Sequence, residues 1–135
     1  MKKCALIPFI IENDEPLYCL KNNNGFFYLC NTSIDSSTSS LETILNFAIT
    51  DLKYNHMRDI TLKKLIYNDI EHIYYAHIIL KDKIKSKDII WLKGSELNNV
   101  TGYGSAYIQK IHEYISTKAL PNAIKQLEDY LIFNE

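Results

Sequence analysis

The sequence predicts an α/β fold in which helices cover the faces of a mixed β-sheet. Two apolar runs of strand length, CALIPFII (4–11) and HIYYAHIIL (72–80), are typical of buried strands. Between them, SSTSSLETILNFAITDLKYN (36–55) has the polar start and the apolar spacing of a capped amphipathic helix. Strands and helices in this order favour a sheet layered between helices.

The first three predicted strands occupy 4–11, 17–21 and 26–31. The turn cluster ENDEP separates the first two, and NNNG separates the second from the third. Because an Asn-rich turn that ends in Gly suits positive backbone dihedrals, we expect the second and third strands to form a hairpin.

The first helix is predicted over about 40–54. Ser39 stands three residues before Glu42, which is the spacing of a capping box. Apolar residues then recur at helical spacing and are predicted to form the buried face. They are Leu41, Ile44, Leu45, Ala48, Ile49 and Leu52.

Three more strands are predicted in the second half, over 60–69, 72–80 and 88–92. The middle strand is apolar on both faces, so we expect it to be central in the sheet. The residues from 93 to 105 are rich in turn formers.

Two helices are predicted at the C-terminal end, over 105–116 and 121–135. The second is expected to begin at Pro121, because proline is favoured in the first helical turn. The inward residues of the two helices are predicted to be Ile108, Ile111, Ile115, Ile124, Leu127 and Leu131.

The length of 135 residues predicts one domain, 1–135, with the last helix as an appendage. The formal net charge of −1 argues against a dedicated nucleic-acid or anionic-membrane binder. No apolar run approaches the ~18 residues of a membrane span. Cys4, Cys19 and Cys30 lie in apolar runs and are interpreted as reduced core thiols. The apolar run after Lys2 and Lys3 is broken at Pro8 and is too short for a signal peptide, so we expect a cytoplasmic protein.

The order of elements resembles the α/β/α sandwich of the Nudix hydrolases. GFFYLCN (25–31) resembles the strand that leads into the family's signature box, and the capped helix follows where the box helix stands. WLKGSEL (91–97) resembles the family's tryptophan followed by a Glu-Leu pair. The resemblance covers roughly residues 3–116, and the helix after Pro121 is an addition to it.

The signature box of that family is G-x5-E-x7-R-E-U-x-E-E-x-G-U, where U is a bulky aliphatic residue, and it is almost entirely degenerate here. Alignment on the apolar helix positions gives one match, Ile49, and one conservative replacement, Asp51. The remaining positions of the motif fall, in order, on Ser33, Ser39, Phe47, Ala48, Leu52, Tyr54 and Asn55.

The resemblance implies a hydrolase that cleaves a nucleoside diphosphate linked to another group, with Mg²⁺ held by carboxylates of the box. Ala48 and Leu52 supply no carboxylate, and Phe47 replaces the arginine that orients the helix carboxylates in the family. We therefore expect the usual catalytic site to be absent and predict neither a metal nor another cofactor.

Three carboxylates are weak candidates for a displaced catalytic site: Glu42, Asp51 and Glu71. Each also has a structural interpretation, as a cap partner, a solvated helix residue and a charge at a hairpin end, respectively. Asp35 is interpreted as a turn former. Glu96 is interpreted as part of the Glu-Leu pair, which chiefly marks a structural turn.

Aromatic rings are the stronger candidates for ligand binding. Phe27, Tyr28, Tyr74 and Tyr75, together with Phe26, are expected on neighbouring strands. There they would line a cleft that stacks a base or another flat ligand. The alternative is a tyrosine-rich core whose hydroxyls reach the rim.

The four histidines of the chain give no metal motif. His56, His72, His77 and His112 have no ligand spacing. His77 lies in a very apolar strand and is interpreted as a hydrogen-bonded core residue.

Three functions follow from these observations. The first is a non-catalytic Nudix-like domain that binds a nucleotide-like ligand or a protein partner. The second is a divergent hydrolase that acts on a nucleoside diphosphate derivative with Mg²⁺. The third is an assembly role, such as a homodimer formed through exposed residues of the C-terminal helices; the candidates are Tyr107, Tyr114, Ile132 and Phe133.

Overall fold

The computed structural model describes the backbone of residues 2–34, 39–50, 60–67, 71–78 and 85–133. Its centre is a seven-stranded sheet in the order β3-β2-β1-β6-β5, in which β4 also pairs with β1 and β7 also pairs with β2. β1 and β6 run parallel and the other pairs are antiparallel, so the sheet is mixed as predicted. The strands are β1 (Lys3–Glu12), β2 (Glu15–Asn23), β3 (Phe26–Tyr28), β4 (Cys30–Ser33), β5 (Ile60–Tyr67), β6 (Glu71–Ile78) and β7 (Ile89–Lys93).

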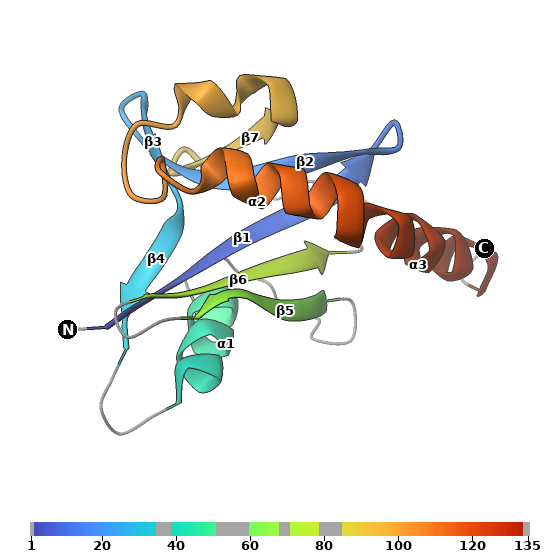
Figure 1. Ribbon diagram of the computed structural model, residues 1–135, viewed down its shortest axis with the longest axis horizontal. Coiled ribbons are helices and arrows are strands. Elements are labelled where there is room, and N and C mark those ends of the chain that lie inside the picture. The colour runs from blue at the N-terminus through green and yellow to red at the C-terminus, as the bar shows by residue number, and fades with distance from the viewer. Residues whose placement is uncertain (1, 35–38, 51–59, 68–70, 79–84, 134–135) are drawn as a thin grey trace.

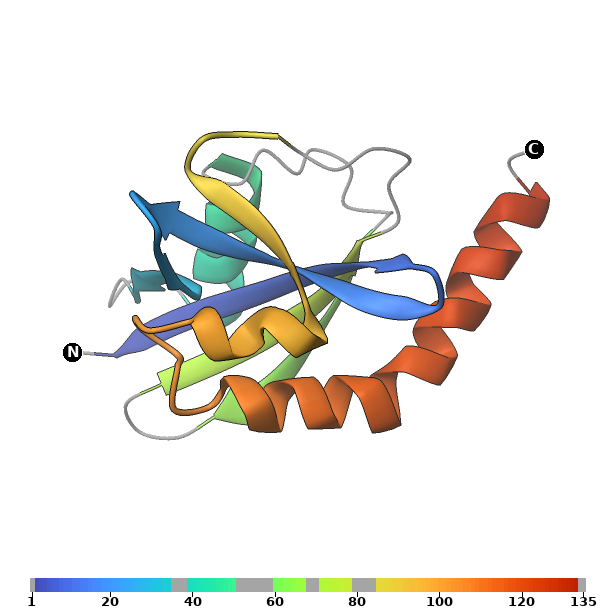
Figure 2. The ribbon, with the colours of Figure 1, turned by 90° about the horizontal axis from the view of Figure 1, so that it is seen from above.

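Helices cover both faces of this sheet (Figure 1). α1 (Ser40–Thr50) lies on one face. On the other face lies a long C-terminal helix made of α2 (Ile108–Tyr114), a π-helical turn (Ile115–Ala119) and α3 (Leu120–Phe133). Figure 2 shows α1 and α2 on opposite sides of the strands and α3 extending past the ends of the strands. A short 3-10 helix (Gly94–Asn99) follows β7.

The two faces of the sheet have separate hydrophobic cores because side chains alternate along β1 and β6. Leu6 and Tyr74 point toward α1, where Ile44 and Phe47 pack on them. On the opposite face, the core beneath α2 contains Ala5, Ile7, Phe9, Tyr18, Leu20, Ile73 and Tyr75 of the strands and Ile108, Ile111 and Ile115 of the helix.

The predicted strand 26–31 is in fact two strands, β3 and β4, separated by Leu29. β3 continues the expected hairpin with β2, through a turn in which Asn24 and Gly25 have φ of 52° and 88°. β4 instead pairs with Lys3–Leu6 of β1, whereas β2 pairs with the far end of the same strand. Because β2 and β4 share one edge of β1, the chain must change position within the sheet at Leu29.

The N-terminal cap predicted for α1 is confirmed, but the prediction of which α1 residues are buried is partly wrong. The Glu42 N–H donates to Ser39 Oγ at 3.1 Å, as expected for a first-turn cap. Leu41 and Ile49, which were expected to be buried, are 48% and 38% exposed. The buried residues are instead Ser40, Ile44, Phe47 and Ala48. The predicted end of the helix at 54 and its inward residue Leu52 lie outside the described residues.

α3 begins at Leu120, one residue before the predicted start at Pro121, but a π-helical turn instead of a loop joins it to α2. Proline has no N–H, and its ring would clash with the carbonyl four residues earlier in a regular α-helix. The π-helical turn widens the backbone immediately before it, and the Leu120 N–H bonds to the Ile115 carbonyl five residues back. The predicted inward residue Leu131 is 50% exposed, whereas Ala119 and Ala123 are in the core.

A pair of glycine substitutions tests the packing between Leu29 and the turn before α2. Gly25 and Gly104 have φ of 88° and 92°, so alanine at either position costs about 1–2 kcal/mol of backbone strain. A Cβ on Gly25 would meet open space, but a Cβ on Gly104 would clash with the fully buried Leu29. We expect Gly104→Ala to lower the free energy of unfolding by a further ~1–3 kcal/mol relative to Gly25→Ala, because the core is overpacked. Equal losses in urea denaturation would contradict this packing.

Candidate functional site

The N-terminal end of α1 is organised by hydroxyl groups. The Ser40 hydroxyl is hydrogen-bonded to the Tyr74 hydroxyl, in a contact that joins α1 to β6. Ser39 accepts the hydrogen bond from the Glu42 N–H, and the Glu42 side chain is exposed in the first turn. This end of the helix is therefore tied to the sheet by neutral groups.

The described part of α1 does not fit the magnesium ion that the Nudix resemblance implies. Phe47 and Ala48, which align with an arginine and a glutamate of the signature box, are 8% and 5% exposed and pack in the core. Within the described residues there is no group of three or more His, Cys, Asp or Glu side chains able to hold a metal. Asp35 and Asp51 lie outside them.

Glu71 forms a separate polar cluster near the beginning of α2. Its Oε2 accepts a hydrogen bond from the Tyr103 hydroxyl at 2.6 Å, and its Oε1 accepts one from the Tyr107 hydroxyl at 2.7 Å. Burial, together with the Glu71 carboxylate, raises the pKa of Tyr103. The Lys3 Nζ lies 5.0 Å from the centre of the Tyr103 ring. Glu71 thus joins the sheet to the turn before α2, on the opposite side of the sheet from Glu42.

The aromatic rings predicted to share a cleft are not brought together. The phenylalanines and Tyr28 are on β3, which is separated from β6 by β2 and β1, so the prediction of neighbouring strands is wrong. Tyr74 packs toward α1 and Tyr75 packs toward α2. Phe27 is half-buried against the core under α2. Ligand binding by these rings stays a prediction, and of the four only Tyr75 faces a cavity described below.

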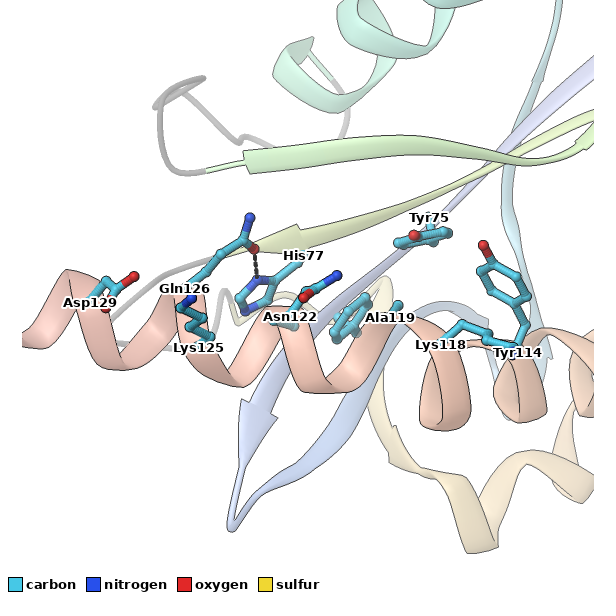
Figure 3. A pocket seen from close by; sticks show the side chains of 11 residues that line it. Tyr75, His77, Tyr114, Lys118, Ala119, Asn122, Lys125, Gln126 and Asp129 are labelled. Carbon is cyan, nitrogen blue, oxygen red and sulfur yellow. Dashed lines mark hydrogen bonds between the residues drawn. The ribbon is translucent and has the colours of Figure 1, made fainter.

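A cavity of about 370 Å³ lies between the sheet and the long C-terminal helix (Figure 3). Its floor is formed by β1 and β6, and its wall by the helix from Tyr114 to Asp129. The lining residues are Phe9, Tyr75, His77, Tyr114, Lys118, Ala119, Asn122, Ala123, Lys125, Gln126 and Asp129. The size falls at the lower end of the range for small-molecule sites, which is about 300–1,000 Å³.

His77 is the most unusual group in this wall. It is 2% exposed, and its Nδ1 lies 3.1 Å from the Gln126 Oε1. Because an amide oxygen only accepts, Nδ1 carries the hydrogen and Nε2 is a bare acceptor. Nε2 is buried and has no hydrogen-bond partner among the described residues. Burial lowers the pKa of His77, so the ring is neutral near pH 7.

Aromatic contacts hold the His77 ring in one orientation. The ring stacks on Phe9, with ring centres 5.3 Å apart and planes 19° from parallel. Beside it, the Tyr75 and Tyr114 rings are 6.0 Å apart, and burial raises the pKa of Tyr75. The interpretation of His77 as a fully hydrogen-bonded core residue is therefore correct for Nδ1 and wrong for Nε2.

A second cavity, of about 310 Å³, lies on the other flank of the long helix and includes His112 in its wall. Here the Nδ1 of His112 is 2.7 Å from the Tyr18 hydroxyl and 3.3 Å from the Ser116 hydroxyl. Burial lowers the pKa of His112 as well. Since its Nδ1 is already bonded within the fold, this histidine is explained by packing between β2 and α2.

Sequence reasoning did not find the first cavity, because its residues come from three segments distant in the chain. The available signal was local: Tyr75 and His77 alternate on one face of β6, and Lys118, Asn122 and Gln126 recur at four-residue spacing. Only the pairing of β1 with β6 and the course of the helix show that these faces meet.

Comparisons with known proteins identify the fold. No protein-family model matches the sequence, and neither does any curated protein. Among solved structures, the Nudix hydrolase RenU of M. smegmatis matches with a TM-score of 0.71 and 11% identity, over 90% of each chain. A C. elegans Ap4A hydrolase matches with a TM-score of 0.61 and 10% identity, over 85% of this chain and 98% of that one.

A third match is the DNA complex of Shewanella oneidensis NrtR, with a TM-score of 0.54 and 11% identity, over 83% of this chain and 58% of that one. At these identities the similarity concerns the fold alone. The chain has a Nudix-like α/β fold with a mixed sheet and a C-terminal helix, which confirms the fold predicted from the order of elements. In the described ranges, no helix combines the length and the apolar character needed to cross a bilayer.

The pH dependence of stability tests the environment of His77. A histidine with a lowered pKa in the folded state binds fewer protons than in the unfolded chain, so stability falls as the pH drops below the unfolded pKa of about 6.5. His77→Phe removes this contribution, keeps a ring beside Phe9 and deletes the unpartnered Nε2. We expect urea denaturation to give a shallower loss of stability between about pH 7 and pH 5.

The same variant is expected to keep the free energy of unfolding at pH 7 within about 1 kcal/mol of wild type. Loss of the Gln126 hydrogen bond lowers the free energy of unfolding, and removal of the unpartnered nitrogen raises it by a similar amount. An unchanged pH slope in His77→Phe would show that the ring already titrates as it does in the unfolded chain.

Proposed function

We propose that this chain is a non-catalytic Nudix-like domain that acts by binding a nucleotide-like ligand, and that residues 1–135 form a single domain with the helix over 121–135 as an appendage. The observation that carries the proposal is the burial of Phe47 and Ala48 in the core beneath α1. These two positions, aligned with an arginine and a glutamate of the signature box, present apolar groups to the sheet.

The chemistry of diphosphate cleavage explains why this observation matters. Hydrolysis needs divalent cations that neutralise the diphosphate and activate water, and hard cations need several oxygen ligands. The one carboxylate of the described α1 is Glu42, which is exposed at the cap. Asp51 alone would offer a single carboxylate, which is a poor ligand set for Mg²⁺ against water.

Two further observations support a nucleotide-like ligand and a cytoplasmic location. One fold neighbour is an Ap4A hydrolase, so the same architecture accommodates a dinucleotide in that protein. The three cysteines are buried thiols, and burial raises the pKa of Cys4 to about 11. Such unreactive core thiols suit a reducing compartment.

The alternative is a divergent hydrolase that uses Mg²⁺ with Asp35, Glu42, Asp51 or Glu71. The hydrogen bonds that Glu71 accepts from Tyr103 and Tyr107 favour a structural role for this carboxylate. Its position on the α2 side of the sheet also separates it from Glu42.

A protein partner or a second copy of the chain is the other alternative. Leu131 and Ile132 near the end of α3 are 50% and 67% exposed, and Tyr114 is 42% exposed. By contrast, Tyr107 is half-buried with its hydroxyl on Glu71, so it contributes less to such a contact than the sequence predicts.

A thermal-shift screen combined with a product assay tests the proposal. The panel contains nucleoside monophosphates, ADP-ribose, sugar nucleotides and diadenosine tetraphosphate, each with and without Mg²⁺ or Mn²⁺. We expect at least one nucleotide to raise the melting temperature without added metal. At about 100 times Kd the gain is ~2.7 kcal/mol, or roughly 10 °C for a chain of this size.

No product should form during the same incubation. Metal-dependent turnover that disappears in Asp51→Asn or Glu42→Gln would overturn the non-catalytic proposal in favour of the hydrolase. Glu113→Gln, on the exposed side of α2, is the matched control for the loss of a carboxylate.

A further inference from the structure

We infer that the cavity between β6 and the long C-terminal helix is a binding site for a small organic anion that also carries an N–H or O–H donor. The inference rests on the proposed binding function and gives it a location, on the face of the sheet opposite α1. The chemical class is that of a nucleoside monophosphate, which unites a phosphate with the ring N–H and sugar O–H groups that can donate.

The first argument is the Nε2 of His77, which has no hydrogen-bond partner within the part of the chain that the structure describes. Buried polar side-chain atoms almost always have a hydrogen-bond partner, and leaving one unpaired is costly. In the present orientation of the imidazole, Nδ1 bonds to Gln126 and the ring stacks on Phe9, so Nε2 is the nitrogen left for a ligand. A donor group from a bound molecule would satisfy Nε2.

The second argument is the size of the space. One ordered water could also satisfy Nε2, but a water occupies about 30 Å³ of liquid volume. The cavity of about 370 Å³ is roughly ten times larger. Nε2 itself is almost wholly covered, so the inferred site requires a neighbouring side chain to move before a donor reaches this nitrogen.

The third argument is the charge of the opposite wall. Lys118 and Lys125 line the cavity from exposed positions on the helix, and Asp129 is the one carboxylate among the described residues of the lining. Figure 3 shows Lys118 beside Tyr114 and Asp129 at the far end of the helix wall. With His77 neutral, the described part of the lining carries a net positive charge, which attracts an anion.

Aromatic and amide groups complete the lining. Tyr114 is 42% exposed and presents its ring beside Tyr75, so a flat group can pack there. Asn122 and Gln126 offer amide groups that can both donate and accept. A ligand with a ring, a donor and an anionic group therefore matches the three kinds of group in the wall.

Nuclear magnetic resonance of the ¹⁵N-labelled full chain tests the site directly. The probes are the adenosine, guanosine, cytidine and uridine monophosphates, with adenosine and inorganic phosphate as the separated parts. Without ligand, the long-range ¹H–¹⁵N spectrum of His77 should show the hydrogen on Nδ1 and a bare Nε2. We expect at least one monophosphate to shift the Nε2 signal, and adenosine and phosphate each to bind at least tenfold more weakly than that monophosphate.

Matched variants separate the site from general effects. Lys118→Ala is expected to weaken binding of that monophosphate about fivefold to tenfold through loss of one charged contact. Lys110→Ala removes an exposed lysine of α2 that does not line the cavity and should leave affinity unchanged. His77→Phe should abolish binding, and its denaturation curve shows whether it remains folded.

The outcomes of this experiment and of the function screen are distinguishable. If a nucleotide raises the melting temperature while the His77 Nε2 signal stays in place and Lys118→Ala binds normally, the binding function stands and this site is wrong. A hydrogen on Nε2 instead of Nδ1 would also overturn the inference. So would the finding that none of the four nucleoside monophosphates shifts the His77 signals. A shift of the His77 Nε2 signal without any turnover supports both the non-catalytic binding function and this site.

Discussion

The parallel pairing of β1 with β6 determines where nearly every feature of this structure lies. The register pairs Lys3–Phe9 of β1 with Glu71–His77 of β6, so that Lys3 lies opposite Glu71 and Phe9 opposite His77. Because two parallel strands cannot be joined by a tight turn, the chain between them must cross over, and α1 is part of that connection. Both strands are covered on both faces, which accounts for their nearly continuous apolar sequences.

This register also distributes the polar groups. A slip of one residue between the two strands would send every side chain of β6 to the other face. Tyr74 would then lose Ser40, and His77 would lose Phe9 and Gln126. The hydroxyl contact under α1 and the cavity under α3 thus both depend on this pairing, because successive residues of β6 face opposite sides of the sheet.

Local sequence patterns predict most of the elements but not their arrangement, and they miss the division of 26–31 into β3 and β4. The cap at Ser39 and the Asn-Gly hairpin were predictable because both depend on groups within four residues. The buried face of α1 was not: Leu41 and Ile49 have helical spacing, but the angle at which α1 meets the sheet buries Phe47 in their place. The site could not be predicted locally either. The order of strands separates the aromatic rings of β3 from Tyr75, and the C-terminal helix lies beside Tyr75 instead.

The long C-terminal helix shows how the cavity is kept open. Pro121 and the π-helical turn alter the course of the helix where it passes the end of β6, and the small side chains of Ala119 and Ala123 leave space against the sheet. An unpaired buried acceptor costs about 1–3 kcal/mol, which is a large part of a typical domain stability of about 5–15 kcal/mol. Local violations of this kind are expected where a protein binds something, because the groups that recognise a ligand are left incomplete in its absence.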